Sequence, residues 1–165
     1  MANILYVDHQ KCTGCQLCEL VCAVSHDGIS NPVRSRIRVV KWEAEGLYIP
    51  MTCQQCQDAP CMNVCPVKAI SRNEELGQVA VDYDVCIGCR SCVGACPFGA
   101  MSFNPVDRQV IKCDLCEGSP QCVRFCEVRA VDFIEADKVS IAKRRRAAER
   151  VSSAAKEAAA LETQL

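Results

Sequence analysis

One stretch of the sequence decides the fold: Cys86-Ile-Gly-Cys89-Arg-Ser-Cys92-Val-Gly-Ala-Cys96-Pro97. Its four cysteines are separated by two, two and three residues, and three similar quartets occur elsewhere in the chain. All sixteen cysteines belong to these quartets, with none left over. In chain order the quartets are Cys12, Cys15, Cys18 and Cys22; Cys53, Cys56, Cys61 and Cys65; Cys86, Cys89, Cys92 and Cys96; and Cys113, Cys116, Cys122 and Cys126. A pattern of this density indicates that cysteine chemistry organises the chain.

The spacing within a quartet is typical of ligands to a 4Fe–4S cluster. Three thiolates within seven to ten residues can surround one corner of a compact cluster. The fourth cysteine, three residues on, is expected to open a helical turn that points away and serves a neighbouring cluster. Pro66 and Pro97 directly follow such a cysteine and suit the first turn of a helix. Gly14 and Gly88 fit a tight, left-handed loop whose amides face the cluster.

Zinc sites and disulfides are the two alternatives to iron. Zinc knuckles pair Cys-x2-Cys motifs about a dozen or more residues apart, often with histidine, whereas this chain has only His9 and His26. Disulfides are typical of exported proteins, but the N-terminal residues do not resemble a signal peptide. No apolar run of roughly 18 residues occurs either. We therefore expect a cytoplasmic, metal-binding chain without a membrane span, unless a partner carries it through an export pathway.

The formal net charge of −1 counts every thiol as neutral. Four clusters, each with a net charge of about −2, would bring the total to about −9. Such a negative protein is a poor ligand for nucleic acid, so we expect no nucleic-acid partner.

Outside the cysteines, the sequence predicts an α+β fold of short hairpins and helical turns. A repeat of about 30 residues follows the last three quartets: Cys65-Pro-Val-Lys-Ala-Ile-Ser71, Cys96-Pro-Phe-Gly-Ala-Met-Ser102 and Cys126-Glu-Val-Arg-Ala-Val-Asp132. In each copy, the last cysteine should open a helical turn and the residues after alanine should start a strand. The strands Gln78–Asp82 and Gln109–Lys112 should then return as hairpins. After the first quartet we expect a loop insertion, Ala23–Ser35, and then a strand, Ile37–Trp42, in which Trp42 is a core residue.

The tail from about Asp137 lacks cysteine, glycine and proline and is rich in Ala, Glu, Lys and Arg. It is therefore predicted to form a long C-terminal helix over 137–165. A narrow apolar seam recurs there at spacings of four and three residues: Ala147, Val151, Ala154, Ala158, Leu161 and Leu165. We interpret the helix as a docking arm for another subunit or for a second copy of the chain. The alternative is that it folds back on its own domain.

The four quartets in this order, with Cys113-Asp-Leu-Cys116 opening the fourth, resemble a known family. It comprises the four-cluster ferredoxin-like electron-transfer subunits of the dimethyl-sulfoxide-reductase iron–sulfur family. The likeness covers about Ile4 to Ile134. Within that group, the chain is most similar to the small iron–sulfur subunit of bacterial tungsten-containing aldehyde oxidoreductases. It departs from the family at Ala23 and Glu127, where a proline often follows the last cysteine.

The resemblance implies two interleaved bacterial-type 2×(4Fe-4S) ferredoxin-like units within a domain of residues 1–136. The first and fourth quartets form one unit, and the second and third form the other, which is nested over 48–104. The implied ligand sets are Cys12, Cys15, Cys18 and Cys126 for cluster A; Cys113, Cys116, Cys122 and Cys22 for cluster B; Cys53, Cys56, Cys61 and Cys96 for cluster C; and Cys86, Cys89, Cys92 and Cys65 for cluster D. Because no ligand position is lost, four 4Fe–4S clusters are expected.

The function implied by the resemblance is a relay of single electrons through these clusters. The partners would be a catalytic tungsten or molybdenum oxidoreductase subunit and an acceptor such as a flavin subunit. The chain itself is expected to be non-catalytic, because it has no nucleotide-binding glycine motif and no iron left open to substrate. Two alternatives stay open: a freestanding, diffusible polyferredoxin, and the electron-transfer subunit of a formate dehydrogenase or hydrogenase.

Overall fold

The computed structural model describes residues 3–141 and 148 of the chain. The strands are β1 (Asn3–Val7), β2 (Arg38–Trp42), β3 (Leu47–Met51), β4 (Ile70–Asn73), β5 (Gln78–Val81), β6 (Ser102–Asn104), β7 (Gln109–Ile111) and β8 (Val131–Glu135). The helices are α1 (Leu17–Asp27), α2 (Pro60–Asn63), α3 (Ser91–Ala95) and α4 (Gln121–Arg124), with 3-10 helices η1 (His9–Lys11), η2 (Pro32–Arg34) and η3 (Leu115–Gly118). For this part of the chain, the predicted mixture of helical turns and small sheets is confirmed.

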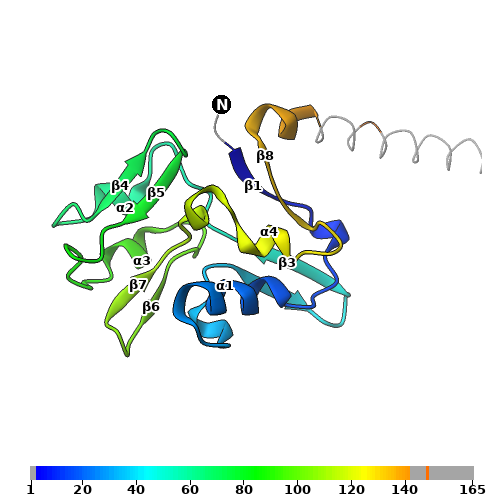
Figure 1. The fold of residues 1–165 in the computed structure, drawn as a ribbon, viewed down its shortest axis with the longest axis horizontal. Coiled ribbons are helices and arrows are strands. Elements are labelled where there is room, and N and C mark those ends of the chain that lie inside the picture. Colours follow the sequence, from blue (N-terminus) through cyan, green and yellow to red (C-terminus); the bar gives the residue numbers. More distant parts are fainter. Residues whose placement is uncertain (1–2, 142–147, 149–165) are drawn as a thin grey trace, which may run out of the picture.

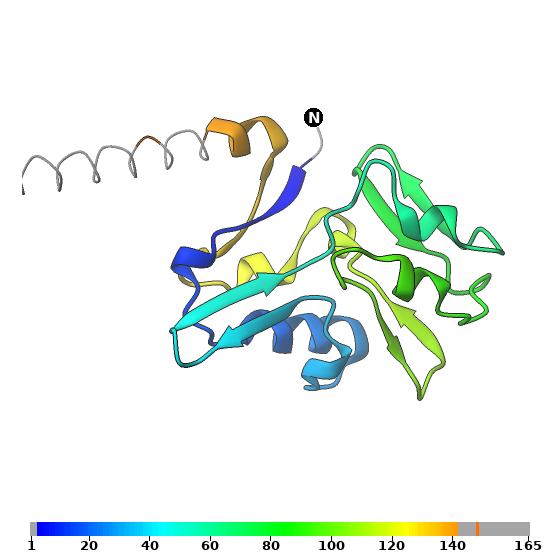
Figure 2. The same cartoon turned by 180° about the vertical axis from the view of Figure 1, so that it is seen from behind.

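The elements gather in two lobes, which Figures 1 and 2 show from opposite sides. One lobe holds β4 to β7 with α2 and α3, and the other holds β1, β2, β3 and β8 with α1 and α4. Each lobe has its own apolar cluster, one built around Ile70, Val79 and Val110 and the other around Ile37 and Val131. Cysteines take part in both clusters, so the apolar core of each lobe lies against its predicted metal ligands.

Every sheet is a single antiparallel pair: β1 with β8, β2 with β3, β4 with β5, and β6 with β7. The first pair joins the two ends of the cysteine-rich region, with Leu5 opposite Phe133. The other three pairs are hairpins. The predicted strands Ile37–Trp42, Gln78–Asp82 and Gln109–Lys112 match β2, β5 and β7 to within one residue at each end, whereas β3 was not predicted. Two hairpins cross the bounds of the predicted nested segment 48–104. β3 lies almost wholly inside it but pairs with β2 outside it, and β7 lies outside it but pairs with β6 inside it.

The prediction that the fourth cysteine of a quartet opens a helical turn is wrong. The helices α2, α3 and α4 contain the third cysteine and end before the fourth. Pro97 instead takes the second position of a β-turn, which is closed by a 3.2 Å hydrogen bond from the Gly99 amide to the Cys96 carbonyl. The fixed φ of proline suits this turn position as well as a helix start, so the residue type does not separate the two structures.

The first quartet departs from this scheme, because α1 contains both its third and its fourth cysteine and runs on to Asp27. The predicted loop insertion Ala23–Ser35 is therefore wrong in its first half. No helix-breaking residue occurs before Gly28, which ends α1 with a left-handed φ of 66°. Trp42 is also not a core residue: it is 44% exposed and lies opposite Leu47, next to the turn of the β2–β3 hairpin.

Residues 136–141 are helical and begin the predicted C-terminal arm. Apart from Ala148, which is also helical, the rest of that arm and its apolar seam lie outside the described residues. No helix in the described part of the chain is long and apolar enough to cross a membrane.

Gly14 and Gly88 have φ values of 71° and 65°, which confirms the predicted left-handed loops. Each also lies against a hairpin. A Cβ atom on Gly88 would lie 2.4 Å from the carbonyl oxygen of Arg108, in the turn between β6 and β7. A Cβ atom on Gly14 would lie 2.6 Å from the ring of Tyr48 on β3. Glycine is therefore needed at both positions for conformation and for space.

We expect Gly88→Ala to destabilise the protein more than Gly28→Ala. Both glycines have positive φ, so either alanine costs about 1–2 kcal/mol in backbone strain. Only at Gly88 does the added Cβ meet another backbone segment, since nothing lies within 4 Å of one at Gly28. The denaturant midpoint, followed by circular dichroism, measures the difference. Equal midpoints would show that the β6–β7 turn moves aside at no cost.

Candidate metal centres

Four cavities in the protein are each lined by four cysteines. In the order A to D, the empty space in and around them amounts to about 330, 290, 350 and 300 Å³, which includes space open to solvent. Their cysteines are Cys12, Cys15, Cys18 and Cys126 in cavity A; Cys22, Cys113, Cys116 and Cys122 in cavity B; Cys53, Cys56, Cys61 and Cys96 in cavity C; and Cys65, Cys86, Cys89 and Cys92 in cavity D. The structure thus brings the cysteines together in the four sets that the family resemblance implied.

The loop at the start of each quartet has the same backbone shape. The residue before the second cysteine is left-handed in all four, with φ between 49° and 71°, and these residues are Gly14, Gln55, Gly88 and Leu115. The reversal lets the first and second thiols face one cavity. At Gln55 and Leu115 this conformation costs about 1–2 kcal/mol, because both carry a Cβ. Strain of this kind persists where the surroundings fix the backbone, and it concentrates at functional sites.

The fourth cysteine of three quartets accepts a hydrogen bond from the backbone amide of the alanine in the repeat. The distances from amide nitrogen to Sγ are 3.3 Å for Ala69 and Cys65, 3.4 Å for Ala100 and Cys96, and 3.2 Å for Ala130 and Cys126. In the first quartet, the Sγ of Cys22 accepts instead from the amide of Arg36, at 3.3 Å. Such N–H···S bonds favour negative charge on the sulfur and tune the potential of a cluster bound there.

The four cavities follow one another in the order A, B, C, D. Helix α1 carries one cysteine of cavity A and one of cavity B. Burial raises the pKa of Cys113 in cavity B to about 11, and the nearby thiol of Cys53 in cavity C adds to the rise. Burial likewise raises the pKa of Cys92 in cavity D, with a contribution from Cys61 in cavity C. Each cavity therefore lies beside the next, and the two lobes meet between B and C.

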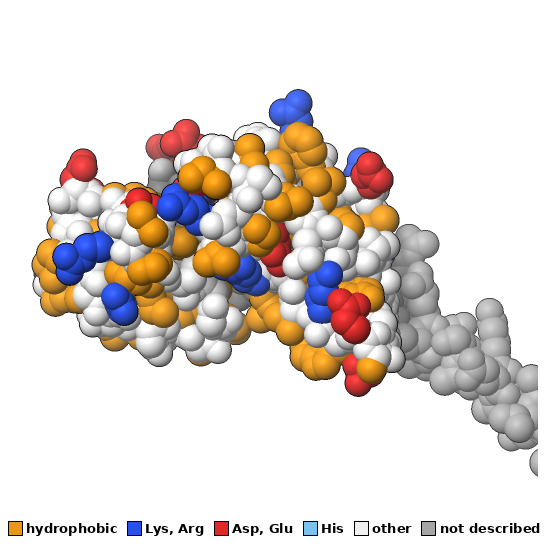
Figure 3. Space-filling view, turned by 90° about the horizontal axis from the view of Figure 1, so that it is seen from below, with side chains coloured by type: hydrophobic (Ala, Val, Ile, Leu, Met, Phe, Trp, Pro, Cys, Tyr) orange, Lys and Arg blue, Asp and Glu red, His pale blue; other side chains and the backbone are white. Residues whose placement is uncertain are grey.

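Only the outer cavities of the row have a cysteine on the surface. Cys15 of cavity A and Cys89 of cavity D are exposed, and all the other cysteines are buried or half-buried. Apolar side chains flank both positions, since Leu17 is 38% exposed and Ile87 is 65% exposed. On the face in Figure 3, hydrophobic side chains lie among scattered charged ones rather than beside a single charged patch. The row therefore opens to solvent at its two ends.

The donor groups of the cavities fit an iron–sulfur cluster. Burial, the Glu19 carboxylate and the Cys15 thiol raise the pKa of Cys18 to about 12. A thiol held in this way does not ionise readily without a positive charge beside it, which the iron of a cluster would supply. Arg36 and Thr52 line cavity B, and each has a buried polar atom, Nη1 and Oγ1, with no hydrogen-bond partner among the described residues. The sulfide atoms of a cluster would offer acceptors to both.

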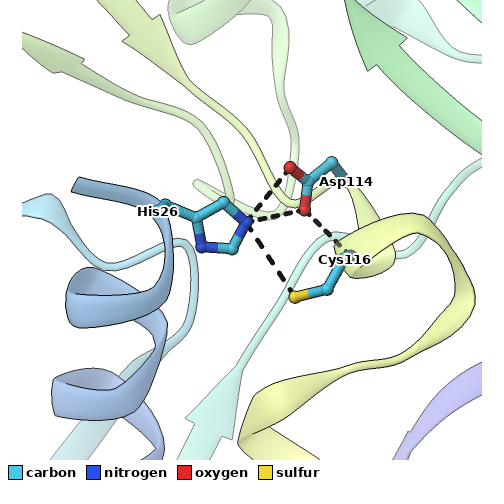
Figure 4. Close-up of side chains that lie close together, drawn as sticks. All are labelled: His26, Asp114 and Cys116. Carbon is cyan, nitrogen blue, oxygen red and sulfur yellow. Dashed lines mark hydrogen bonds and ion pairs between the residues drawn. The ribbon is translucent and has the colours of Figure 1, made fainter. Parts of the chain in front are cut away.

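His26 and Asp114 form an ion pair at cavity B, next to Cys116 (Figure 4). Nε2 of His26 lies 3.0 and 3.1 Å from the two carboxylate oxygens of Asp114, and Nδ1 lies 2.8 Å from the carbonyl oxygen of Cys22. The bond to Asp114 raises the pKa of His26 to about 12. Burial alone would raise the pKa of Asp114, but the bond from His26 lowers it to about 2. The pair ties α1 to the loop of the fourth quartet.

Sequence reasoning used His26 only as evidence against zinc and missed this contact. The available signal was its spacing, because His26 follows Cys22 by four residues and so lies on the same face once α1 is known to be a helix. His26, Asp114 and Cys116 lie close enough together to hold a metal ion. Cys116, however, already belongs to the four cysteines of cavity B, so we do not count these three residues as a separate site.

Four cysteine-lined cavities on short hairpins and helical turns define an iron–sulfur protein of the 4Fe–4S ferredoxin class. Residues 44–136 match the 4Fe-4S dicluster domain family, and residues 9–25 match a 4Fe-4S binding domain. The chain therefore belongs to the 4Fe-4S dicluster domain family.

Curated relatives carry names from electron transport. An aliphatic sulfonate oxidoreductase, polyferredoxin-like subunit, of Pyrococcus furiosus is 46% identical over 56% of this chain and 53% of its own length. The putative electron transport protein YsaA of Escherichia coli is 47% identical over 61% of this chain and 66% of its own length. The thiosulfate reductase electron transfer subunit PhsB of Salmonella typhi is 38% identical over 67% and 60%. The protein thus spans about half to two thirds of the length of these relatives.

A solved structure is similar over most of the chain. It is a chain of the active site complex BamBC of benzoyl coenzyme A reductase in complex with zinc, with a TM-score of 0.50 and 25% sequence identity. The match covers 94% of this chain and 98% of the other. The family match and the curated relatives confirm the expected likeness to 4Fe-4S ferredoxin-like electron-transfer subunits.

The His26–Asp114 pair should stabilise the protein as one unit. We expect His26→Gln and Asp114→Asn each to lower the free energy of unfolding by about 1–3 kcal/mol, because each leaves a partly buried charge without its partner. The double variant should be as stable as the less stable of the two single variants, or more so. Denaturant midpoints of the cluster-loaded protein measure these effects, with Asp58→Asn at an exposed position as control. Strictly additive losses would show that the two side chains act separately.

Proposed function

We propose that the chain is an electron-transfer subunit that carries single electrons between a catalytic oxidoreductase subunit and an acceptor. The observation that carries the proposal is the row of four cysteine-lined cavities whose two ends alone have a cysteine at the surface. Each cavity would hold one 4Fe–4S cluster through the four cysteines that line it, with the ligand sets A to D given above.

A bound 4Fe–4S cluster supplies reversible one-electron chemistry, and the protein sets its surroundings. Cys15 and Cys89 are the cysteines exposed at the surface, so an electron would enter or leave by the shortest path near one of them. The apolar side chains of Leu17 and Ile87 at these ends can be covered by a partner, which would exclude water from the transfer path. The chain thus offers two separate contact points, one for a donor and one for an acceptor.

We infer that the catalytic partner is a molybdenum or tungsten oxidoreductase. Two relatives are named as subunits, one of an aliphatic sulfonate oxidoreductase and one of a thiosulfate reductase. The metal, a flavin subunit as acceptor and a cytoplasmic location rest on the family resemblance and on the sequence. The narrower proposal is a tungsten-containing aldehyde oxidoreductase, with the segment 137–165 as the docking arm.

Iron analysis tests the class of protein first. The complex purified without oxygen should contain about sixteen iron and about sixteen sulfide atoms per copy of this chain. The reduced protein should give a paramagnetic resonance spectrum of interacting spins, because neighbouring cavities adjoin. Stoichiometric zinc, or a colourless folded protein, would contradict the proposal. A chain that purifies alone would favour a freestanding polyferredoxin.

Pairs of cysteine substitutions test the ligand sets. Cys96→Ala combined with Cys53→Ala should lose no more iron than either single variant, because both residues line cavity C. Cys96→Ala combined with Cys86→Ala should lose the iron of two clusters, because Cys86 lines cavity D. Iron per folded chain is the measurement. The opposite pattern would show that each quartet binds a cluster of its own.

A further inference from the structure

Lys112 is a buried charge at the point where the two lobes meet. The whole residue is only 2% exposed to solvent. The ammonium group donates hydrogen bonds to Oε1 of Gln55 and to the carbonyl of Cys113, both at 3.2 Å, and to the carbonyl of Val79. None of the ion pairs among residues 3–141 involves Lys112. The group therefore has three acceptors and no carboxylate.

This arrangement fits a protonated amine whose positive charge is balanced by a negative group other than a carboxylate. An ammonium group has three donors and no acceptor, so three oxygen partners satisfy it completely. A buried charge still requires an opposite charge nearby. Lys112 lines cavity C and bonds to the backbone of a cysteine of cavity B, so the thiolate-bound clusters proposed for these two cavities would supply it.

The electrostatic surroundings of the cysteines agree with this placement. Burial raises the pKa of Cys61 in cavity C and of Cys113 in cavity B, and the positive charge of Lys112 opposes the rise in both. Lys112 thus acts on one cysteine from each inner cavity. The same cation favours any further negative charge that arrives in either cavity.

Arg36 adds a second cation on the side of cavity B. Its Nε donates to the carbonyl oxygen of Lys112 at 3.0 Å, and its amide donates to the Sγ of Cys22. Arg36 lines cavity B, and its Nη1 is one of the two buried atoms without a hydrogen-bond partner noted above. The His26–Asp114 pair at the same cavity joins one positive and one negative group and adds no net charge.

The outer cavities lack a comparable buried cation. No charged side chain lines cavity A. Cavity D is lined by Arg90, but this residue is exposed, and its guanidinium group stacks on the ring of Phe103 at 3.8 Å. Solvent screens an exposed charge far more than a buried one. The difference between inner and outer cavities therefore lies in Lys112 and Arg36.

We propose that Lys112 and Arg36 form a positive junction that gives the two inner clusters higher reduction potentials than the two outer ones. This inference rests on the proposed function. Reduction adds one electron and no proton to a cluster, and a buried cation stabilises the added negative charge. An electron that enters at an outer cluster leaves that cluster oxidised and reduces an inner one. Electrons thus collect at the centre of the row until an acceptor takes them from an end.

Redox titration of the purified complex, followed by paramagnetic resonance, tests the junction. Signals are assigned with one cysteine-to-serine variant in each cavity. Lys112→Met should shift the midpoint potentials of clusters B and C downward, whereas Arg36→Met should shift that of cluster B alone. Clusters A and D should keep their potentials in both variants. If Lys112→Met retains all its iron and its four midpoints equal those of the unmodified protein, the inference is wrong.

Three further variants separate charge from structure. Lys138→Met removes a 65% exposed lysine and should change no midpoint. Gln55→Leu breaks the hydrogen bond to Lys112 but keeps its charge, so it should shift clusters B and C less than Lys112→Met does. If Lys112→Met loses clusters, Lys112→Gln takes its place in the experiment. The glutamine also removes the charge but keeps a hydrogen-bond donor. Equal shifts in Gln55→Leu and the Lys112 variants would overturn the junction, whereas low iron in the unmodified protein would overturn the proposed function itself.

Discussion

The fold depends on the crossing of cysteines between quartets, since every cavity takes three cysteines from one quartet and the fourth from another. Cavity A takes Cys126 from the fourth quartet, and cavity B takes Cys22 from the first. The two ends of the cysteine-rich region are thereby held together, and the pairing of β1 with β8 follows from this closure. Metal bonds that close such long loops restrict the unfolded chain strongly. This explains how a chain with only eight aromatic residues, and therefore little large apolar surface to bury, can form two ordered lobes.

The two lobes are joined by polar contacts rather than by a shared apolar core. Their apolar clusters are separate. Gln55 and Gln78 of one lobe donate hydrogen bonds to the carbonyls of Cys113 and Asp114 in the other, and Lys112 spans the same boundary. Fully satisfied buried polar groups add rigidity and specify one geometry. A boundary of this kind holds cavities B and C at a fixed separation while it places charge and dipoles between them.

Much of the site could be predicted from the sequence, because cysteine spacing limits which thiols can share a cavity. The assignment of each fourth cysteine came from the family resemblance, since spacing alone does not choose its partner quartet. The helices were placed one cysteine too late, because proline after Cys96 suits a β-turn and a helix start equally. The roles of Lys112 and Arg36 could not be predicted. Their positions depend on how distant segments pack, and no local pattern marks them.

The departure of the first quartet from the repeat explains why cavity B differs from the other three. Elsewhere the chain turns directly after the fourth cysteine, and an alanine amide four residues on reaches its sulfur. After Cys22 nothing stops the helix before Gly28, so the nearby amides bond within α1. The amide of Arg36 replaces them at the sulfur. The longer path also carries the side chains of His26 and Arg36 to this cavity, so one prolonged helix gives a single site in the row its distinct charge.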